Sequence, residues 1–232
     1  FTIDRQQGAS LSGRLGAGSA YDSSYWLELL SGQGRGNSWE DGEWMAMARY
    51  QWNFLGRVLP FSQSDLANRQ EPAGSLSLAG VVAETPFTRF SGDGGGQLPG
   101  LEKGDYDLVQ LQQGGAYHYR GFSIQEELHF KSIRDDDSET ERDLLGGYVS
   151  VGTFPASYWT DWPRELELAA RAAIVDPNLD SAGLEQEWTL GANWFFNGHR
   201  NKLSADVAYL TEEDPGTGDD AVRFRVQWDV SF

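Results

Sequence analysis

The sequence predicts an all-β protein, with one antiparallel sheet of about eleven strands forming a single domain over residues 1–232. Three observations support this fold class. Apolar and polar residues alternate along many short segments, as they do on a strand with one face toward water. Glycine is abundant, with 28 residues, and so are the aromatic residues, with 9 Trp, 9 Tyr and 12 Phe. The connections between these segments are rich in Gly, Asp, Asn and Pro, which favour turns.

The last segment, AVRFRVQWDVSF (221–232), shows the alternation most clearly, because every second residue is apolar. The segments 165–174 and 187–196 alternate in the same way. Ala and Leu in 165–175 also suit a helix, but the period of two favours a strand. The predicted strands are 9–17, 24–32, 43–54, 75–84, 105–120, 122–133, 143–152, 165–175, 185–196, 202–210 and 221–232.

Composition excludes several classes of protein. The chain has no Cys and only three His, which leaves no disulfide framework and argues against a His-rich metal site, so we expect neither a metal nor a cofactor. Its net charge of −17 argues against a nucleic-acid partner. With a mean hydropathy of −0.51, it contains no apolar run long enough for a transmembrane helix.

The strand lengths and the connections favour a transmembrane antiparallel β-barrel. Apart from the longer segment 105–120, each predicted strand has roughly 9–14 residues, the length that a tilted strand needs to cross a bilayer. Long acidic loops alternate with short turns, although the connections 59–74 and 153–164 are exceptions on the short side. The second exception carries Tyr158, Trp159 and Trp162, which fits an aromatic girdle at a membrane interface. The alternative is a soluble sandwich or barrel.

Several stretches resemble the phosphate-selective porin O and P family. They are RQQGASLSGRLG (5–16), TPFTRFSGDGGGQLPG (85–100), GFSIQEELHFKSI (121–133) and LGANWFFNGHRNKLSADVAYL (190–210). The terminal WDVSF is similar to the closing strand that the barrel-assembly machinery recognises. The resemblance implies a homotrimeric porin of 16-stranded barrels in the outer membrane of a Gram-negative bacterium, in contact with lipid and lipopolysaccharide, with the termini of the full barrel periplasmic.

Eleven strands are five fewer than this family has. The count fits the C-terminal part of a 16-stranded barrel, and the alternative is a complete barrel of 10 or 12 strands with one segment miscounted. Under either arrangement we expect a water-filled channel for passive diffusion of small hydrophilic solutes or ions. A non-channel barrel acting as a structural anchor or adhesin is the alternative function.

Charged residues on the polar faces of the predicted strands are the candidate pore-lining residues. They could form a track for anions or could pair across neighbouring strands. The resemblance implies selectivity for anions such as phosphate, but 18 Lys and Arg against 35 Asp and Glu put that selectivity in doubt. The candidates are Arg14, Glu28, Arg49, Glu127, His129, Lys131, Arg171, Asp206, Arg223, Arg225 and Asp229.

Two loops raise further hypotheses. The glycine-rich segment 90–105 could fold inward as a constriction loop carrying Asp93, Glu102, Lys103 and Asp105, or could remain a mobile external loop. The acidic run 135–141 could bind Ca²⁺ but lacks EF-hand spacing, so a solvated loop is the better interpretation.

The chain is not expected to be an enzyme. His118, His129 and His199 are the only candidate bases, and no Gly-X-Ser-X-Gly motif is present. Ser123 and Ser132 lie near His129 in the sequence, but the strand alternation directs Ser132 away from it. A barrel hydrolase would need a Ser–His contact at hydrogen-bond distance.

Overall fold

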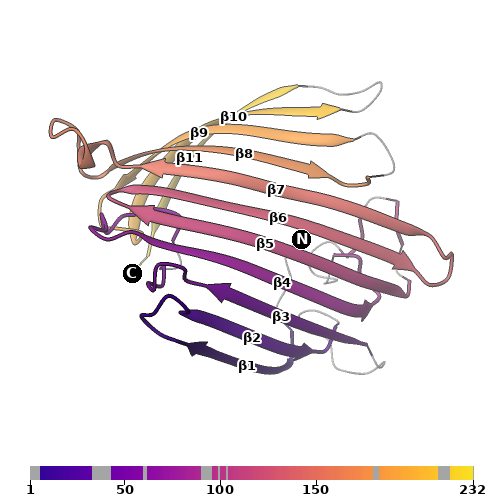
Figure 1. Ribbon diagram of the computed structural model, residues 1–232. Helices are drawn as coiled ribbons and strands as arrows, with labels where there is room; N and C mark the ends of the chain where they lie inside the picture. The colour runs from indigo at the N-terminus through magenta and orange to yellow at the C-terminus, as the bar shows by residue number, and fades with distance from the viewer. Residues whose placement is uncertain are drawn as a thin grey trace.

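A computed structural model describes residues 6–32, 43–59, 62–89, 96–98, 100–102, 104–179, 183–213 and 220–231. They form one antiparallel sheet of eleven strands in chain order, which confirms the all-β prediction and the strand count (Figure 1). The strands are β1 (Gly8–Leu15), β2 (Ser23–Leu30), β3 (Trp44–Trp52), β4 (Ala73–Thr85), β5 (Tyr106–Tyr119), β6 (Phe122–Asp135), β7 (Glu141–Thr153), β8 (Leu166–Asp176), β9 (Leu184–Phe195), β10 (Asn201–Glu213) and β11 (Ala221–Val230).

Helical structure is nearly absent from the described residues. A short 3₁₀ turn, η1 (Pro155–Ser157), lies in the β7–β8 connection. Among the described residues, no helix has the length and apolar character that a transmembrane helix requires.

The β5–β6 turn shows how local sequence fixes the strand pairing. Arg120 and Gly121 both have positive φ angles, of 50° and 75°, and they form a two-residue connection. Positive φ at both central residues is the geometry of a type I′ hairpin turn, whose twist matches that of the flanking strands. A Cβ atom on Gly121 would lie 2.3 Å from Ser157 Oγ, so glycine is required here by space as well as by conformation.

The strands are staggered along the sheet. When paired residues are followed from each strand to the next, the path leads from Leu15, the last residue of β1, to Val222, the second residue of β11. This progressive shift tilts the strands as in a barrel, and the sheet curls in Figure 1. The sheet is not closed, because within the described residues β1 pairs only with β2 and β11 only with β10.

Register separates the side chains into two faces. One, the polar face, carries most of the charged and amide side chains of the strands. The other, the apolar face, exposes large hydrophobic side chains on every strand. Examples on the apolar face are Leu11, Leu27, Tyr50, Leu78, Leu111, Leu128, Val149, Leu168, Leu190, Val207, Phe224, Val226 and Trp228.

A hydrophobic cluster occupies one end of the polar face. It includes Met45 on β3, Leu108 on β5 and Ile133 on β6, all of which are buried. Leu98 and Leu101 of the β4–β5 connection pack against it. The cluster is therefore formed where the β4–β5 connection folds onto the polar face, while the large hydrophobic side chains of the apolar face stay exposed.

Candidate functional site

The charged residues predicted to line a pore share one face of the sheet. The register places all eleven, from Arg14 on β1 to Asp229 on β11, on the polar face. Their common orientation follows from strand alternation, because paired residues of neighbouring antiparallel strands point to the same side of a sheet. The role of this face as a pore lining remains a prediction.

Ion pairs cross the neighbouring strands β8 to β11 on this face. Glu187 lies 3.5 Å from Arg171 and 2.9 Å from Arg223. Asp206 is 3.1 Å from Arg225, and the guanidinium of Arg171 also lies 4.8 Å from the ring centroid of Tyr148. Lys202 completes the series, 3.7 Å from Asp229 on β11. Opposite charges thus alternate across four strands and largely neutralise one another.

The remaining predicted residues have different environments. Glu127 and His129 contact each other on β6, with Oε2 and Nε2 3.1 Å apart. Lys131 is buried and donates a hydrogen bond to the carbonyl oxygen of Thr88. None of the described ion pairs joins an Arg to Glu28 or Glu127, so the expected pairing across neighbouring strands does not extend to these two acids.

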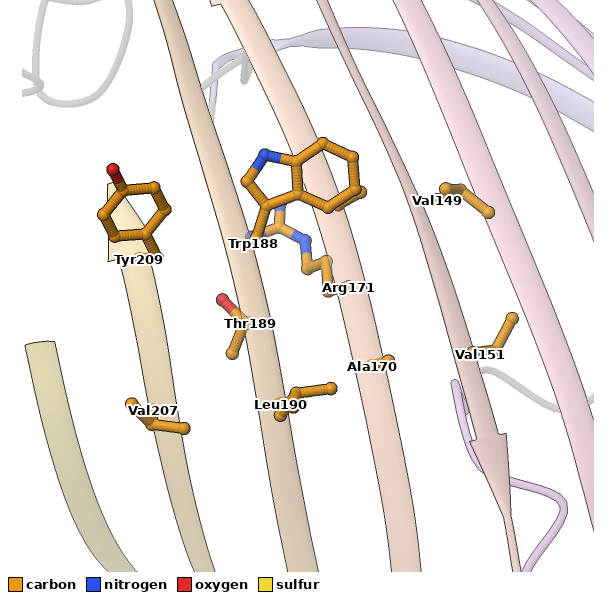
Figure 2. Close-up of a pocket in the computed structure, with 10 residues that line it drawn as sticks. Val149, Val151, Ala170, Arg171, Trp188, Thr189, Leu190, Val207 and Tyr209 are labelled. Carbon is orange, nitrogen blue, oxygen red and sulfur yellow. The ribbon is translucent and has the colours of Figure 1, made fainter. Parts of the chain in front are cut away.

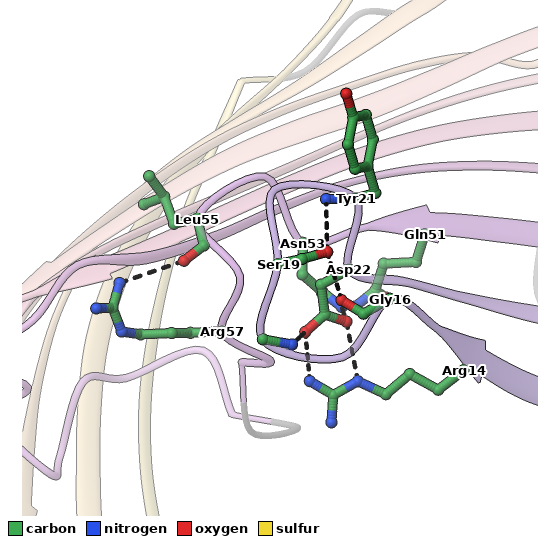
Figure 3. A network of polar contacts seen from close by, with 10 residues as sticks. Arg14, Gly16, Ser19, Tyr21, Asp22, Gln51, Asn53, Leu55 and Arg57 are labelled. Carbon is green, nitrogen blue, oxygen red and sulfur yellow. Dashed lines mark hydrogen bonds and ion pairs between the residues drawn. The ribbon is translucent and has the colours of Figure 1, made fainter.

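Arg14 belongs to a polar network at the β1–β2 turn (Figure 3). It forms a bidentate ion pair with Asp22, whose buried carboxylate also accepts hydrogen bonds from the Gly18 amide at 2.9 Å and from Asn53 Nδ2 at 3.1 Å. The Arg14 hydrogen bonds, followed by those of Gly18 and Asn53, hold the pKa of Asp22 well below its usual range against the opposing effect of burial. The network fixes the turn to the start of the β3–β4 connection.

The β4–β5 connection folds over the polar face near β3 to β6. It lies at the end of the strands that carries the connections β2–β3, β4–β5 and β6–β7, which we call the loop end, as opposed to the turn end. Gln97 accepts a hydrogen bond from the Thr88 amide at 3.0 Å, and its Nε2 donates to the carbonyl oxygen of Pro86 at 2.6 Å. The Leu98 amide donates to Thr88 Oγ1 at 2.8 Å. With Lys131 bound to Thr88, these contacts fasten the described part of the connection onto the sheet.

Two of the four constriction-loop candidates lie among the described residues. Asp93 and Lys103 lie outside the described residues. The side chain of Glu102 is exposed, while its carbonyl oxygen accepts a hydrogen bond from Tyr106 Oη at 2.5 Å. Asp105 is also exposed, and its carbonyl oxygen accepts a hydrogen bond from the Asp136 amide of the β6–β7 turn. Among the described residues, neither carboxylate forms an ion pair.

The β3–β4 connection also crosses the polar face, at the opposite end, where the short turns lie. Asp65 is buried and accepts a hydrogen bond from the Gly121 amide of the β5–β6 turn at 2.8 Å. Ser64 Oγ donates to Glu167 of β8 at 2.9 Å. Ser62 Oγ lies 3.0 Å from Nε2 of His199, in the β9–β10 turn. The connection therefore reaches from β3 to the β9–β10 turn and narrows the open part of the polar face.

The contact between Ser62 and His199 bears on the hydrolase alternative. Ser62 Oγ also donates to the Ser64 carbonyl at 3.0 Å, which occupies its proton. In the described part of the chain, His199 has no carboxylate partner that would orient it as a general base. Burial, and secondarily Lys202, lower the pKa of His199. These features suit a structural contact between the two connections.

The structure also shows the contacts of the other two candidate serines and the conformation of the acidic run. Ser132 Oγ donates to Glu141 at 2.7 Å on the opposite face from His129, and Ser123 Oγ lies 3.5 Å from the Gly152 carbonyl. Within the described ranges, no group of three or more His, Asp or Glu side chains is arranged to hold a metal ion. Residues 136–140 of the acidic run form an exposed turn.

The apolar face is continuous across β7 to β10. Figure 2 shows side chains from these four strands lining a shallow hollow of about 430 Å³. Trp188 and Leu190 on β9 are 58% and 64% exposed, although both are large hydrophobic side chains. Large exposed hydrophobic areas of this kind indicate contact with lipid or with another protein.

The sequence did not identify several residues of this site. Glu187 could have been assigned to the polar face from the period of two, because it lies two residues before Thr189 on β9 and next to Trp188 on the other face. Asp22, Asp65 and Glu167 gave less signal, because their burial depends on connections that carry no periodicity.

Comparison with known proteins gives no relative: no family model, no curated protein and no solved structure matches the chain.

Proposed function

We propose that this chain forms the wall of a water-filled channel in a bacterial outer membrane, through which small hydrophilic solutes and ions diffuse passively. The observation that carries the proposal is the division of one curled sheet into two faces of opposite character. An apolar face of exposed Leu, Val, Trp and Phe suits the hydrocarbon of a bilayer. A polar face of paired charges suits water.

Aromatic side chains near the strand ends support the membrane location. Trp44 and Trp188 lie toward the loop ends of their strands, and Trp52 and Trp228 lie toward the turn ends. Trp and Tyr favour the two interfaces of a bilayer, because each combines an apolar ring with a polar group. Tyr158 and Trp159 in the β7–β8 connection are exposed as well, at 53% and 62%.

Closure of the barrel requires strands beyond the eleven described. A sheet edge carries unpaired backbone N–H and C=O groups, which are costly in hydrocarbon. Strands β1 and β11 run in the same direction, because ten antiparallel pairings separate them. An all-antiparallel barrel would therefore need an odd number of further strands between these edges. The five strands that complete a 16-stranded porin satisfy this condition, and a homotrimer of such barrels belongs to the same proposal.

The balance of charges argues for weak selectivity. Glu187, Asp206 and Asp229 neutralise cations on β8 to β11, so the polar face does not present a continuous row of free Arg and Lys. A preference for phosphate would need such a row. Size exclusion by the β3–β4 and β4–β5 connections is the stronger determinant of what passes.

Conductance of the purified full-length protein in a planar bilayer tests the proposal, with the reversal potential measured under a salt gradient. Stepwise openings of constant size are expected, with a reversal potential close to zero. A silent bilayer from folded protein would overturn the proposal and favour the alternative, a barrel that serves as an anchor or adhesin.

A further inference from the structure

The polar face contains a pocket of about 560 Å³ on β2 to β6. Trp26 and Glu28 come from β2, Met47 and Arg49 from β3, and Gln112 from β5. The pocket lies beside the hydrophobic cluster that the β4–β5 connection covers, since Val81 belongs to both. Its volume is in the range of sites that hold small organic molecules.

Two charged side chains of this pocket differ from the other predicted pore-lining residues. Each of the other nine has an ion pair or, for Lys131, a hydrogen bond to a carbonyl oxygen. Glu28 and Arg49 have no ion pair in the described part of the chain, although both line the same pocket.

Arg49 is held in place by contacts other than an ion pair to any described residue. Its guanidinium lies 5.7 Å from the ring centroid of Trp26. Its Nη2 has two long contacts, 3.4 Å to Gln51 Oε1 and 3.4 Å to Ser77 Oγ. Its Nε is shielded from solvent and has no hydrogen-bond partner among the described residues. A guanidinium with unused donors is suited to a planar carboxylate.

Glu28 lies one step away on the neighbouring strand. The register pairs Trp26 with Arg49 and Glu28 with Met47, so Glu28 and Arg49 are diagonal neighbours across β2 and β3. Diagonal neighbours have Cα atoms about 7–8 Å apart. The carboxylate and the guanidinium form no ion pair with each other, and both side chains line the same pocket of about 560 Å³.

The pocket wall beside these charges is apolar in part, and Gln51, Gln110, Gln112 and His129 add polar side chains to it. Met47, Ala79 and Val81 lie on the same face as Glu28 and Arg49, and Trp26 adds an aromatic surface. The site thus combines a cation, an anion and an apolar surface. This combination matches a zwitterion with an apolar side chain.

From this arrangement we infer that the pocket binds zwitterionic amino acids with apolar side chains, with the ligand carboxylate on Arg49, its ammonium group on Glu28 and its side chain against Met47 and Val81. The inference rests on the proposed function, because the polar face must be accessible to solutes. It adds a specific subsite to a channel that otherwise discriminates by size.

The test uses leucine and two probes that each lack one of its charged groups: 4-methylpentanoate, which lacks the ammonium, and isoamylamine, which lacks the carboxylate. Binding to the full-length protein folded in detergent micelles is measured by titration calorimetry. Leucine should bind at least about tenfold more tightly than either probe with a single charge. Equal affinity for all three, or no binding of leucine, would overturn the inference.

Two variants assign the contacts. Arg49→Gln should abolish the preference for leucine over isoamylamine, and Glu28→Gln should abolish the preference for leucine over 4-methylpentanoate. Arg134→Gln and Glu139→Gln make the same charge changes at the exposed end of β6 and in the β6–β7 turn, and should leave leucine affinity unchanged. A loss of affinity in these two variants as large as in the pocket variants would contradict the assignment.

Bilayer recordings separate this inference from the proposed function. A conducting protein without leucine binding would refute the subsite and leave the channel standing. A protein that binds leucine but does not conduct would refute the channel and leave the subsite standing.

Discussion

Leu111 and Gln112 are neighbours on β5 that point to opposite faces of the sheet, so they allow a direct test of lipid contact. Leu111 is 57% exposed and pairs with Gly80 and Phe130 on the apolar face. Gln112 pairs with Ala79 and His129 on the polar face. Replacing each by Arg places the same charge on either side of one strand.

The expected cost differs between the two variants. An Arg on the lipid face of a barrel costs about 2–4 kcal/mol near the bilayer midplane. Leu111→Arg also loses the favourable free energy of moving a leucine side chain from water into hydrocarbon. That free energy is about 1.5–3 kcal/mol for a whole side chain, and about 1–2 kcal/mol for the 57% of Leu111 that the sheet leaves exposed. We therefore expect a loss of about 3–6 kcal/mol for Leu111→Arg and less than about 1 kcal/mol for Gln112→Arg.

Urea unfolding of the full-length protein folded into phospholipid vesicles measures both values. A large difference between Leu111→Arg and Gln112→Arg would support an apolar face in contact with hydrocarbon. Equal stability of the two variants, or a greater loss for Gln112→Arg, would refute the assignment of faces to lipid and water.

Three further predictions concern the turns and connections. Asp22→Ala should cost about 2–4 kcal/mol in urea unfolding, because it leaves Arg14 and two other donors without their buried acceptor. Folding lowers the pKa of Asp22. The stabilisation that its carboxylate gives to the folded state is therefore present above the unfolded pKa of about 3.9 and is lost as pH falls further. The wild-type protein and Asp22→Ala should thus converge in stability in strong acid. Asp65→Ala should release the β3–β4 connection and give a larger single-channel conductance than wild type; an unchanged conductance would mean that the connection does not narrow the channel. Gly121→Ala should cost about 1–3 kcal/mol because of its φ of 75° and its approach to Ser157, whereas Gly80→Ala, whose Cβ would meet its nearest atom at 3.6 Å, should be tolerated, and similar losses in both would contradict this reasoning.

Strand positions could be predicted from the sequence because a period of two is a local property. Once one residue of a strand is assigned to a face, the others follow, as they do from Val222 to Val230 on β11. This is why all eleven predicted pore-lining residues occupy one face of the sheet. The predicted number of strands is right because turn residues, which are also a local signal, bound each segment.

Pairing partners and folded connections depended on the tertiary structure. Which acid meets Arg171 is set by the register of β8 with β9, and alternation alone cannot choose among carboxylates on the same face. The path of the β3–β4 connection is fixed by single contacts, such as Asp65 with Gly121 and Ser64 with Glu167, between residues far apart in the chain. The sequence alone therefore determined strands and faces, which are local and periodic. Only the three-dimensional structure decided which charges are neutralised and which, at Glu28 and Arg49, line a pocket without an ion pair to any described residue, because that depends on distances between strands.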